Sequence, residues 1–487
     1  MNSQMDYKVK EFFFIGKRLN IVIMVILTLC WSSSFSQYLK VSENQRYLVT
    51  ENEQPFFWMG DTAWELFHKL DLIEIEHYLM NRSAKGYTVI QAVILAECDG
   101  LTKPTPEGYL PLEKNNPLVP NEAYFKKIDQ VVALAAKYNL YLALLPTWGS
   151  HAEDKEHALF DNLSIFSPKN AFEYSKFLGN RYKNNWNIVW ITGGDRIPEG
   201  NEGIWTNMIE GLKTGSQGKH LITYHINGGH SITEYPGIAE QLDFYMLQSG
   251  HGNAVNPNYQ MIKKDYDVIP TKPVIDGEPV YEDIPIAFNP VNGYNTDYEA
   301  RRAMYWSVFA GGFGTTYGNN AVWQMNRKEY PPILYPIQTW DKAIDAKGSF
   351  QVRYLKSLFK SRPFLERIPD QSLIMGDNAS QSDFKVATRD GTKGQNDATY
   401  IMAYFPIVRD IGINTAVIGS EEIRAWYYDP RTGLAYLIGN YKNTGSFSPK
   451  WNKRIRESMG GSDWVLVIDD ASKNYSPPGV ILKNNSK

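Results

Sequence analysis

Ile188-Val-Trp-Ile-Thr-Gly-Gly-Asp195 is an apolar run that ends in two glycines and an acidic residue. A short, uninterrupted apolar run that leads into a glycine turn predicts a strand of a parallel sheet, buried on both faces. The run Val274-Ile-Asp-Gly-Glu278 has the same form and also ends in an acid. Because active sites of parallel barrels lie at the carboxyl ends of the strands, the two runs predict a pair of carboxylates at one site.

Further apolar runs alternate with segments of helical periodicity from Leu39 onward. The predicted strands are Phe56–Asp61, Thr88–Leu95, Tyr141–Leu145, the run that begins at Asn187, Leu221–His225, Phe244–Leu247, Pro273–Glu278 and Gly311–Tyr317. Asp71, Asn121 and Ser167 are predicted to cap helices between them. Eight strand–helix units within roughly 300 residues predict an α/β fold of the (β/α)8 TIM-barrel type. No Gly-x-Gly-x-x-Gly motif follows the first strand, which disfavours a dinucleotide-binding fold.

The sequence changes character after about Ile374, where short runs rich in β-branched and aromatic residues replace the alternation. These runs include Thr399–Tyr404, Arg424–Tyr428 and Trp464–Ile468, and Asp390-Gly391 and Thr432-Gly433 are turn signals between them. The pattern predicts a small antiparallel β-sandwich. We therefore expect a barrel domain over residues 37–372 and an accessory β domain over residues 373–487. No low-complexity linker separates the two, so we expect them to pack together.

The composition narrows the function classes. The formal net charge is −3 without a clustered basic stripe, which argues against a nucleic-acid partner. Aromatic residues make up 14% of the chain, with 13 Trp and 31 Tyr. Aromatic faces stack well on sugar rings, although most of these rings are expected to fill the core of a chain of 487 residues.

The N-terminus has the features of a signal peptide. Lys17 and Arg18 precede an apolar run over residues 21–30, and Ser34-x-Ser36 forms a cleavage site before Gln37. The run is short for a membrane span, so we expect residues 1–36 to be removed and the protein to be exported to the periplasm or cell surface without stable membrane insertion. Lipid attachment at Cys30 is a second option, disfavoured by Leu29, and a retained anchor is a third.

Export with cleavage would leave Cys98 as the single cysteine of the mature chain and no internal disulfide. A lone cysteine is more often a buried small hydrophobic residue than a nucleophile. No Gly-x-Ser-x-Gly motif is present, so a serine hydrolase has little support. The segment from His151 to His157 is rich in His and acids but lacks the His-Glu-x-x-His spacing, so we expect no metal and no other cofactor.

Asp195 and Glu278 would end the fourth and seventh barrel strands, whose ends lie across the barrel mouth from each other. Two facing carboxyl groups are the equipment for breaking a glycosidic bond. A separation of about 5–5.5 Å predicts retention of anomeric configuration, and about 6.5–9.5 Å predicts inversion. The alternative for each acid is a structural ion pair with a cation of the barrel rim.

Other polar and aromatic residues follow the remaining strands and could bind sugar hydroxyls or stack on a sugar ring. We expect roughly half of such residues to line the pocket and the rest to be structural, with Asp61 a leading structural case. The candidate substrate-binding residues are Asp61, Trp64, Gln91, Glu97, Trp148, His151, His225, Asn227, Gln248, His251 and Tyr317.

Several of these motifs together resemble the apiosidase-like glycoside hydrolases, glycoside hydrolase family 140. The motifs are Trp58-Met-Gly-Asp-Thr-Ala-Trp64, Gly86-Tyr-Thr-Val-Ile-Gln91, Trp190-Ile-Thr-Gly-Gly-Asp195 and Asp276-Gly-Glu-Pro279. Trp426-Tyr-Tyr-Asp-Pro-Arg-Thr-Gly433 and Asp463-Trp-Val-Leu-Val467 resemble the collagen-binding-like β domain that often accompanies them.

The resemblance implies a (β/α)8 barrel with Asp195 as acid/base and Glu278 as nucleophile. It also implies release of apiose-linked side chains from the pectic polysaccharide rhamnogalacturonan II. Most of the wider glycosidase clan has Asn-Glu at the end of strand four, where this chain has Gly194-Asp195, so the role of Asp195 follows from the apiosidase-like subgroup. The alternatives are a glycosidase of other specificity, such as an arabinosidase or a galactan-cleaving enzyme, and a non-catalytic glycan- or collagen-binding surface protein.

Overall fold

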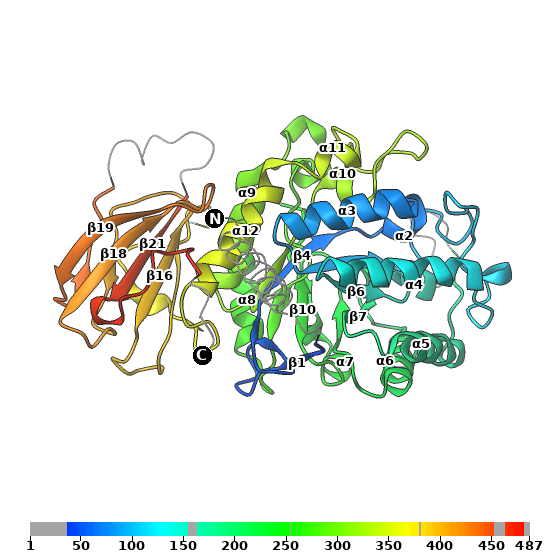
Figure 1. Cartoon of the computed structure of the whole chain (residues 1–487), viewed down its shortest axis with the longest axis horizontal. Helices are drawn as coiled ribbons and strands as arrows, with labels where there is room; N and C mark the ends of the chain where they lie inside the picture. The colour runs from blue at the N-terminus through cyan, green and yellow to red at the C-terminus, as the bar shows by residue number, and fades with distance from the viewer. Residues whose placement is uncertain (1–36, 154–162, 254, 379–380, 452–462, 482–487) are drawn as a thin grey trace, which may run out of the picture. The chain divides into compact units, whose positions relative to one another are not determined.

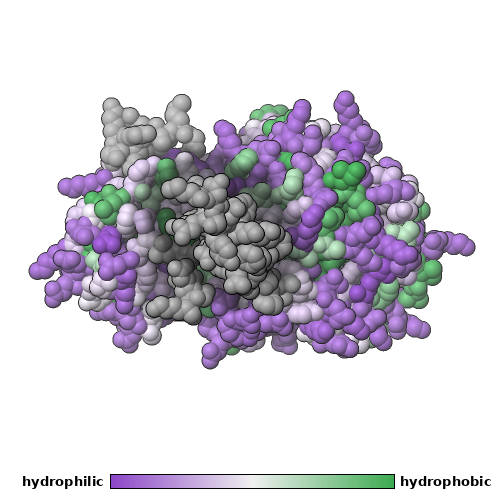
Figure 2. Space-filling model, viewed as in Figure 1, coloured by the Kyte–Doolittle hydropathy of each residue, from purple (hydrophilic) through white to green (hydrophobic). Residues whose placement is uncertain are grey.

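The computed structural model of the chain describes residues 37–153, 163–253, 255–378, 381–451 and 463–481. The predicted signal peptide, including Cys30, lies outside these residues, as does the part of the His151–His157 segment from residue 154 onward. Within the described ranges no helix is long and apolar enough to cross a membrane. In the view of Figure 2 most of the surface is hydrophilic, with smaller apolar patches between.

Eight parallel strands form the barrel, and they correspond to the eight predicted ones. They are β4 (Trp58–Thr62), β5 (Val89–Val93), β6 (Tyr141–Leu145), β7 (Ile188–Gly193), β8 (Ile222–His225), β10 (Tyr245–Gln248), β11 (Val274–Asp276) and β12 (Gly314–Tyr317). Six of them pair in the order β12-β4-β5-β6-β7-β8, and β10 pairs in parallel with β11. Because β10 lies against β8 and β11 against β12, the sheet curls into a ring. The predicted TIM-barrel fold is confirmed.

The first predicted strand is divided in the structure. Phe56 belongs to a small antiparallel sheet of β1 (Leu39–Val41), β2 (Leu48–Thr50) and β3 (Pro55–Phe56), which precedes β4. A two-residue strand, β9 (His230–Ser231), also pairs with β10 in antiparallel orientation. Both are additions to the eight-strand pattern, and neither contributes a barrel strand.

Helices cover the outside of the barrel between its strands (Figure 1). The longer ones are α3 (Leu72–Ala84), α4 (Glu122–Lys137), α5 (Pro168–Tyr182), α6 (Glu202–Ser216), α8 (Asn258–Tyr266), α9 (Asp297–Phe309) and α12 (Lys347–Lys360). Short helices are α2 (Leu66–Lys69), α7 (Pro236–Ala239), α10 (Asn320–Trp323) and α11 (Trp340–Ala343). The predicted caps Asp71, Asn121 and Ser167 each accept a hydrogen bond from a first-turn backbone N–H.

Aromatic side chains close the barrel at the amino ends of its strands. The Trp58 ring packs edge-on against Phe244 and Phe313, with ring centres 5.8 and 6.2 Å away. A side chain at Gly60 would meet Thr316 Oγ1 at 2.7 Å, so the interior has no spare room at this level. The filled interior leaves the carboxyl ends of the strands as the place for a site.

The C-terminal region forms two antiparallel sheets. The larger sheet has the order β13 (Ile368–Pro369), β15 (Val386–Arg389), β16 (Tyr400–Phe405), β21 (Trp464–Asp470), β18 (Glu422–Tyr428) and β19 (Ala435–Lys442). The smaller sheet contains β14 (Ile374–Met375), β17 (Gly412–Asn414) and β20 (Ser446–Phe447). An antiparallel β domain is confirmed, and its sheet begins at Ile368, ahead of the expected boundary at residue 373.

Both faces of the central strand β16 are buried, because its side chains alternate between two cores. Ile401 and Ala403 pack in the core of the β domain, whereas Met402 and Tyr404 join the core of the barrel. Across this contact the Arg301 guanidinium of α9 binds both Asp463 oxygens at 2.8 Å, and neither side chain is exposed. The β domain therefore packs against the barrel, as expected from the missing linker.

Candidate active site

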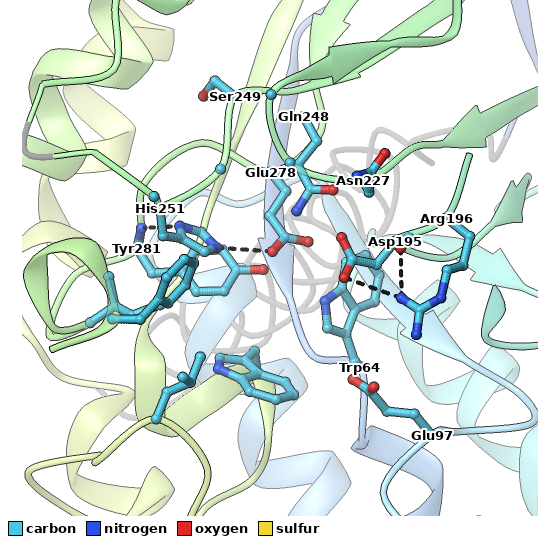
Figure 3. A pocket seen from close by; sticks show the side chains of 18 of the residues that line it. Trp64, Glu97, Asp195, Arg196, Asn227, Gln248, Ser249, His251, Glu278 and Tyr281 are labelled. Carbon is cyan, nitrogen blue, oxygen red and sulfur yellow. Dashed lines mark hydrogen bonds and ion pairs between the residues drawn. The ribbon is translucent and has the colours of Figure 1, made fainter. Parts of the chain in front are cut away.

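A cavity of about 530 Å³ lies at the carboxyl ends of the barrel strands, where the two predicted catalytic acids lie (Figure 3). Its acids are Glu97, Glu153, Asp195 and Glu278, and its aromatic walls are Trp64, Trp148, Tyr281, Phe288 and Trp323. The remaining polar lining includes Arg196, Asn227, Gln248, Ser249, His251 and Asn253. Its size suits one or two sugar rings held between aromatic faces and hydrogen-bonding groups.

Asp195 reaches the cavity from a turn that directly follows β7. Gly193, Gly194 and Asp195 have φ angles of 86°, 110° and 57°, so three successive residues lie in the left-handed region. A Cβ at Gly194 would also lie 2.7 Å from the Gly149 backbone nitrogen. An aspartate with positive φ carries a cost of about 1 kcal/mol or more, which is typical of functional turns. Gly193 and Gly194 therefore allow the sharp turn that places the Asp195 side chain at the cavity.

Glu278 is held by two histidines on neighbouring strand ends. His251 Nε2 lies 3.0 Å from Oε1 of Glu278, and His225 Nε2 lies 3.1 Å from Oε2. The other ring nitrogen of each histidine accepts a backbone N–H, His225 from Asp195 at 3.2 Å and His251 from Tyr281 at 3.3 Å. This arrangement places the ring proton of both histidines on Nε2. His251 hydrogen-bonds to Oε1 of Glu278, whereas the contact of His225 with Oε2 lacks the geometry of a hydrogen bond.

The two acids have opposite tendencies to ionise. Burial alone would raise the pKa of Glu278, but the contacts with His225 and His251 outweigh it and hold the pKa at about 2. Burial, followed by the negative charge of Glu278, raises the pKa of Asp195 to about 6. The Asp195 side chain keeps 39% of its surface accessible from the cavity, so water there relieves part of the burial. Between about pH 2 and pH 6 a protonated acid thus lies beside an ionised one.

His225 contacts both of the predicted catalytic residues. Its Nδ1 accepts the backbone N–H of Asp195, and its Nε2 contacts the Glu278 carboxylate. The ring is fully buried and packs edge-on against Trp64, with ring centres 5.2 Å apart. It does not line the cavity, so its position fits the orientation of the two acids and not contact with a sugar.

Apart from His225, the predicted substrate-binding residues divide into two groups. Trp64, Glu97, Trp148, Asn227, Gln248 and His251 line the cavity. Among these, burial and the charges of Glu65 and Asp195 raise the pKa of Glu97 well above its usual range.

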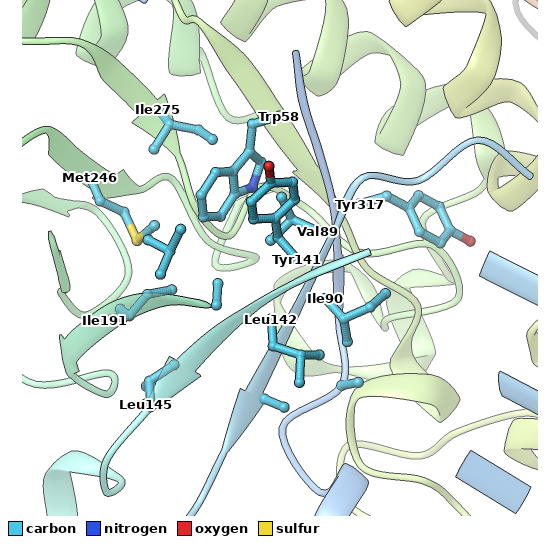
Figure 4. Packing of buried hydrophobic residues seen from close by; sticks show 14 of the residues in the cluster. Trp58, Val89, Ile90, Tyr141, Leu142, Leu145, Ile191, Met246, Ile275 and Tyr317 are labelled. Carbon is cyan, nitrogen blue, oxygen red and sulfur yellow. The ribbon is translucent and has the colours of Figure 1, made fainter. Parts of the chain in front are cut away.

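Asp61, Gln91, His151 and Tyr317 do not line the cavity, because their side chains bond elsewhere. Asp61 pairs with Arg82, and Tyr317 donates to Glu282 at 2.5 Å on the outer side of the barrel. The Tyr317 ring points away from Trp58 and Ile275 in Figure 4. Gln91 donates to the Gly277 carbonyl at 3.0 Å below the cavity, and His151 lies 3.0 Å from the Ala96 carbonyl. For these four the expected substrate contact is replaced by packing.

Several cavity residues have no counterpart in the prediction. Arg196 follows Asp195, and its guanidinium lies 3.6 Å from the Asp195 carboxyl and 2.9 Å from that of Glu153. Phe288 comes from the segment after β11, and Trp323 of α10, Ile333 and Leu334 come from the segment after β12. Residues far from a strand end show no sequence pattern that places them at the site. Arg196 could have been predicted, because it directly follows Asp195 in the sequence. In the described ranges no group of three or more His, Cys, Asp or Glu side chains could hold a metal ion.

Comparisons with known proteins identify the families that the two domains match. Residues 42–366 match the family described as the apiosidase-like catalytic domain, and residues 368–469 match one described as "Putative collagen-binding domain of a collagenase". No curated protein sequence matches the chain.

Two solved structures are similar over nearly the whole length. A glycoside hydrolase is 31% identical with a TM-score of 0.81, over 91% of this chain and 98% of that one. A glycoside hydrolase family 5 protein from Bacteroides vulgatus ATCC 8482 is 30% identical with a TM-score of 0.82, over 91% of this chain and 95% of that one. A third structure from the same organism shares the fold at 12% identity and a TM-score of 0.62.

Proposed function

This chain belongs to the apiosidase-like glycoside hydrolases, and we propose that it cleaves a glycosidic bond of a pectic polysaccharide with retention of anomeric configuration. The observation that supports this reaction is the opposite ionisation of two carboxyl groups on one cavity. The pKa of Asp195 is raised to about 6 and that of Glu278 is lowered to about 2. Between these values one group carries a proton to give and the other a charge to attack with.

In the first step the Glu278 carboxylate attacks the anomeric carbon while Asp195 gives its proton to the bridging oxygen. The bond to the leaving sugar breaks, and a glycosyl ester forms on Glu278. In the second step Asp195, now ionised, takes a proton from water, whose oxygen displaces Glu278. The two histidines stabilise Glu278 as a carboxylate before attack and as a leaving group afterwards.

The stereochemistry of the product tests this mechanism. ¹H NMR during the first minutes of hydrolysis should show the sugar released with the anomeric configuration of the substrate. Release of the opposite anomer would instead require a water molecule between the acids and would assign Glu278 as a general base. As a control, the spectrum at equilibrium gives the mutarotated mixture, from which the early product must differ.

We propose rhamnogalacturonan II side chains that carry apiose as the substrate, on the strength of the family. Incubating the pure enzyme with fragmented rhamnogalacturonan II should release side-chain oligosaccharides that have apiose at their reducing end, measured by chromatography of the products. A panel with arabinan, galactan and hemicelluloses tests the alternative specificities. Saturable binding to collagen without hydrolysis of any glycan would favour the surface-binding alternative, for which the two opposed acids would have no use.

We propose that the protein works outside the cytoplasm after removal of residues 1–36. N-terminal sequencing of the protein from an exporting host should begin at Gln37. A mature protein that begins at Cys30 and carries lipid would identify the lipid-anchored alternative.

A further inference from the structure

A second cavity, of about 440 Å³, lies on the β domain and shares no residue with the active site. Its walls come from β18, β19 and the segment that follows β21. They are Arg424, Trp426, Leu437, Asn440, Tyr475 and Pro477. Strand β19 is the edge strand of the six-stranded sheet, so this cavity opens at a free margin of the domain.

The register of the two strands brings the walls onto one face. Trp426 lies opposite Leu437, and Arg424 lies opposite Asn440 in the antiparallel pair. Leu437 is 58% exposed, while Trp426 is 9% exposed and forms the floor. An apolar floor and wall of this kind suit the C–H face of a sugar ring.

The aromatic walls are held in place from behind. The Trp426 indole N–H donates to Asp469 at 3.2 Å, and Asp469 also receives two bonds of 2.8 Å from Arg362. The Tyr475 hydroxyl lies 2.7 Å from Thr399 Oγ1. Arg362 therefore balances the charge of Asp469 inside the domain. The rings of Trp426 and Tyr475 are fixed in position before any ligand binds.

The cavity carries one charge, which is positive. Arg424 donates from Nε to Asn440 Oδ1 at 3.0 Å, which fixes the plane of its guanidinium. In the described part of the chain its two Nη groups donate no hydrogen bond, and none of the six lining residues is acidic. A guanidinium oriented in this way matches a carboxylate.

We propose that this cavity is an accessory site for a uronic-acid unit of a glycan chain, with the sugar carboxylate on Arg424 and the ring against Trp426 and Leu437. The choice of a pectic chain as the source of that unit rests on the proposed function. A second contact of this kind keeps the enzyme on an acidic polymer between cleavage events, because the tethered active site meets a high local concentration of bonds.

Binding of oligogalacturonate by the full-length Glu278→Gln protein tests the proposal. This ligand is uniformly acidic, and it lacks the side chains that the proposed reaction cleaves. Its binding can therefore be measured without hydrolysis. Calorimetric titration should show saturable binding that weakens at least about tenfold in Arg424→Gln and in Leu437→Ser. Lys442→Gln, which removes a positive charge from the same edge strand, is the matched control and should bind like the parent.

Three outcomes would overturn the proposal. One is unchanged affinity in both Arg424→Gln and Leu437→Ser. Another is equal affinity for carboxyl-reduced oligosaccharide, which would identify a neutral-sugar site. The third is that a triple-helical collagen peptide competes with oligogalacturonate and that binding of this peptide also requires Arg424. Loss of oligogalacturonate binding in Arg424→Gln, combined with no cleavage of any pectic fragment by the parent, would keep this site and reject the proposed function.

Discussion

Asp61 and Glu278 are both buried acids near the ends of barrel strands, yet their surroundings differ in kind. Asp61 is fully buried outside the strand ring, where it pairs with Arg82 at 2.5 Å and accepts a hydrogen bond from Tyr78. Glu278 faces a cavity, meets two imidazoles and lies close enough to Asp195 to raise its pKa. A buried acid with a permanent cation stabilises the fold, whereas an acid that faces a cavity, contacts two imidazoles and has a second acid beside it is available for reaction.

The strongest test of this difference is Glu278→Gln. We expect kcat to fall by about 10⁴-fold or more, because the amide cannot form the glycosyl ester. The melting temperature should stay close to that of the parent, since Gln keeps the shape. Turnover within tenfold of the parent in the pure variant would remove Glu278 from the chemistry.

Asp195→Asn should have the next largest effect. Loss of the proton donor is expected to lower kcat by about 10²–10⁴-fold, and less for substrates whose leaving group needs no proton. Comparing a natural glycan with an aryl glycoside of an acidic phenol measures this dependence. Azide should restore turnover of the aryl glycoside in Asp195→Ala by forming the glycosyl azide, and equal losses on both substrates would contradict the role of an acid.

Asp61→Asn should act on stability and leave the chemistry intact. Removing one partner of a buried ion pair leaves Arg82 uncompensated, so we expect a loss of about 3–5 kcal/mol in the free energy of unfolding. Urea denaturation measures this loss, and kcat per folded molecule should stay within a fewfold of the parent. Tyr78→Phe, which keeps the ion pair, is the matched control. A large fall in kcat without a loss of stability would show that Asp61 takes part in the reaction.

The smallest expected effect comes from His251→Ala. The contact with His251 lowers the pKa of Glu278, so its loss should raise that pKa and move the acidic limb of the kcat/KM profile to higher pH. The alkaline limb reports loss of the Asp195 proton and should stay near pH 6. His230→Ala, at an exposed histidine of β9, is the control with an unchanged profile. An unmoved acidic limb in His251→Ala would show that another group sets it.

The eight strands and the positions of the two acids could be predicted because runs that are buried on both faces are continuously apolar and bounded by turns. Because both faces of these strands are buried, the sequence does not show which face of the strand each residue lies on. Asp61 and Tyr317 lie opposite each other in the β4–β12 register and both point outward, whereas Thr62 lies opposite Gln91, whose side chain stays within the barrel. Without polar–apolar alternation, nothing in the sequence separates these two directions. Trp323 of α10 and the loop residue Leu334 could not be predicted as walls of the cavity, because only tertiary packing brings them to the barrel mouth.

The imidazole of His225 spans from the backbone of one catalytic residue to the carboxylate of the other. A five-membered aromatic ring is rigid, and the β7–β8 ladder places it opposite Gly193, two residues before Asp195. The ring therefore limits how far the Asp195 backbone can move relative to the Glu278 carboxylate. Because the ring is rigid and joins two neighbouring strand ends, we expect the two residues to shift together when the barrel is warmed.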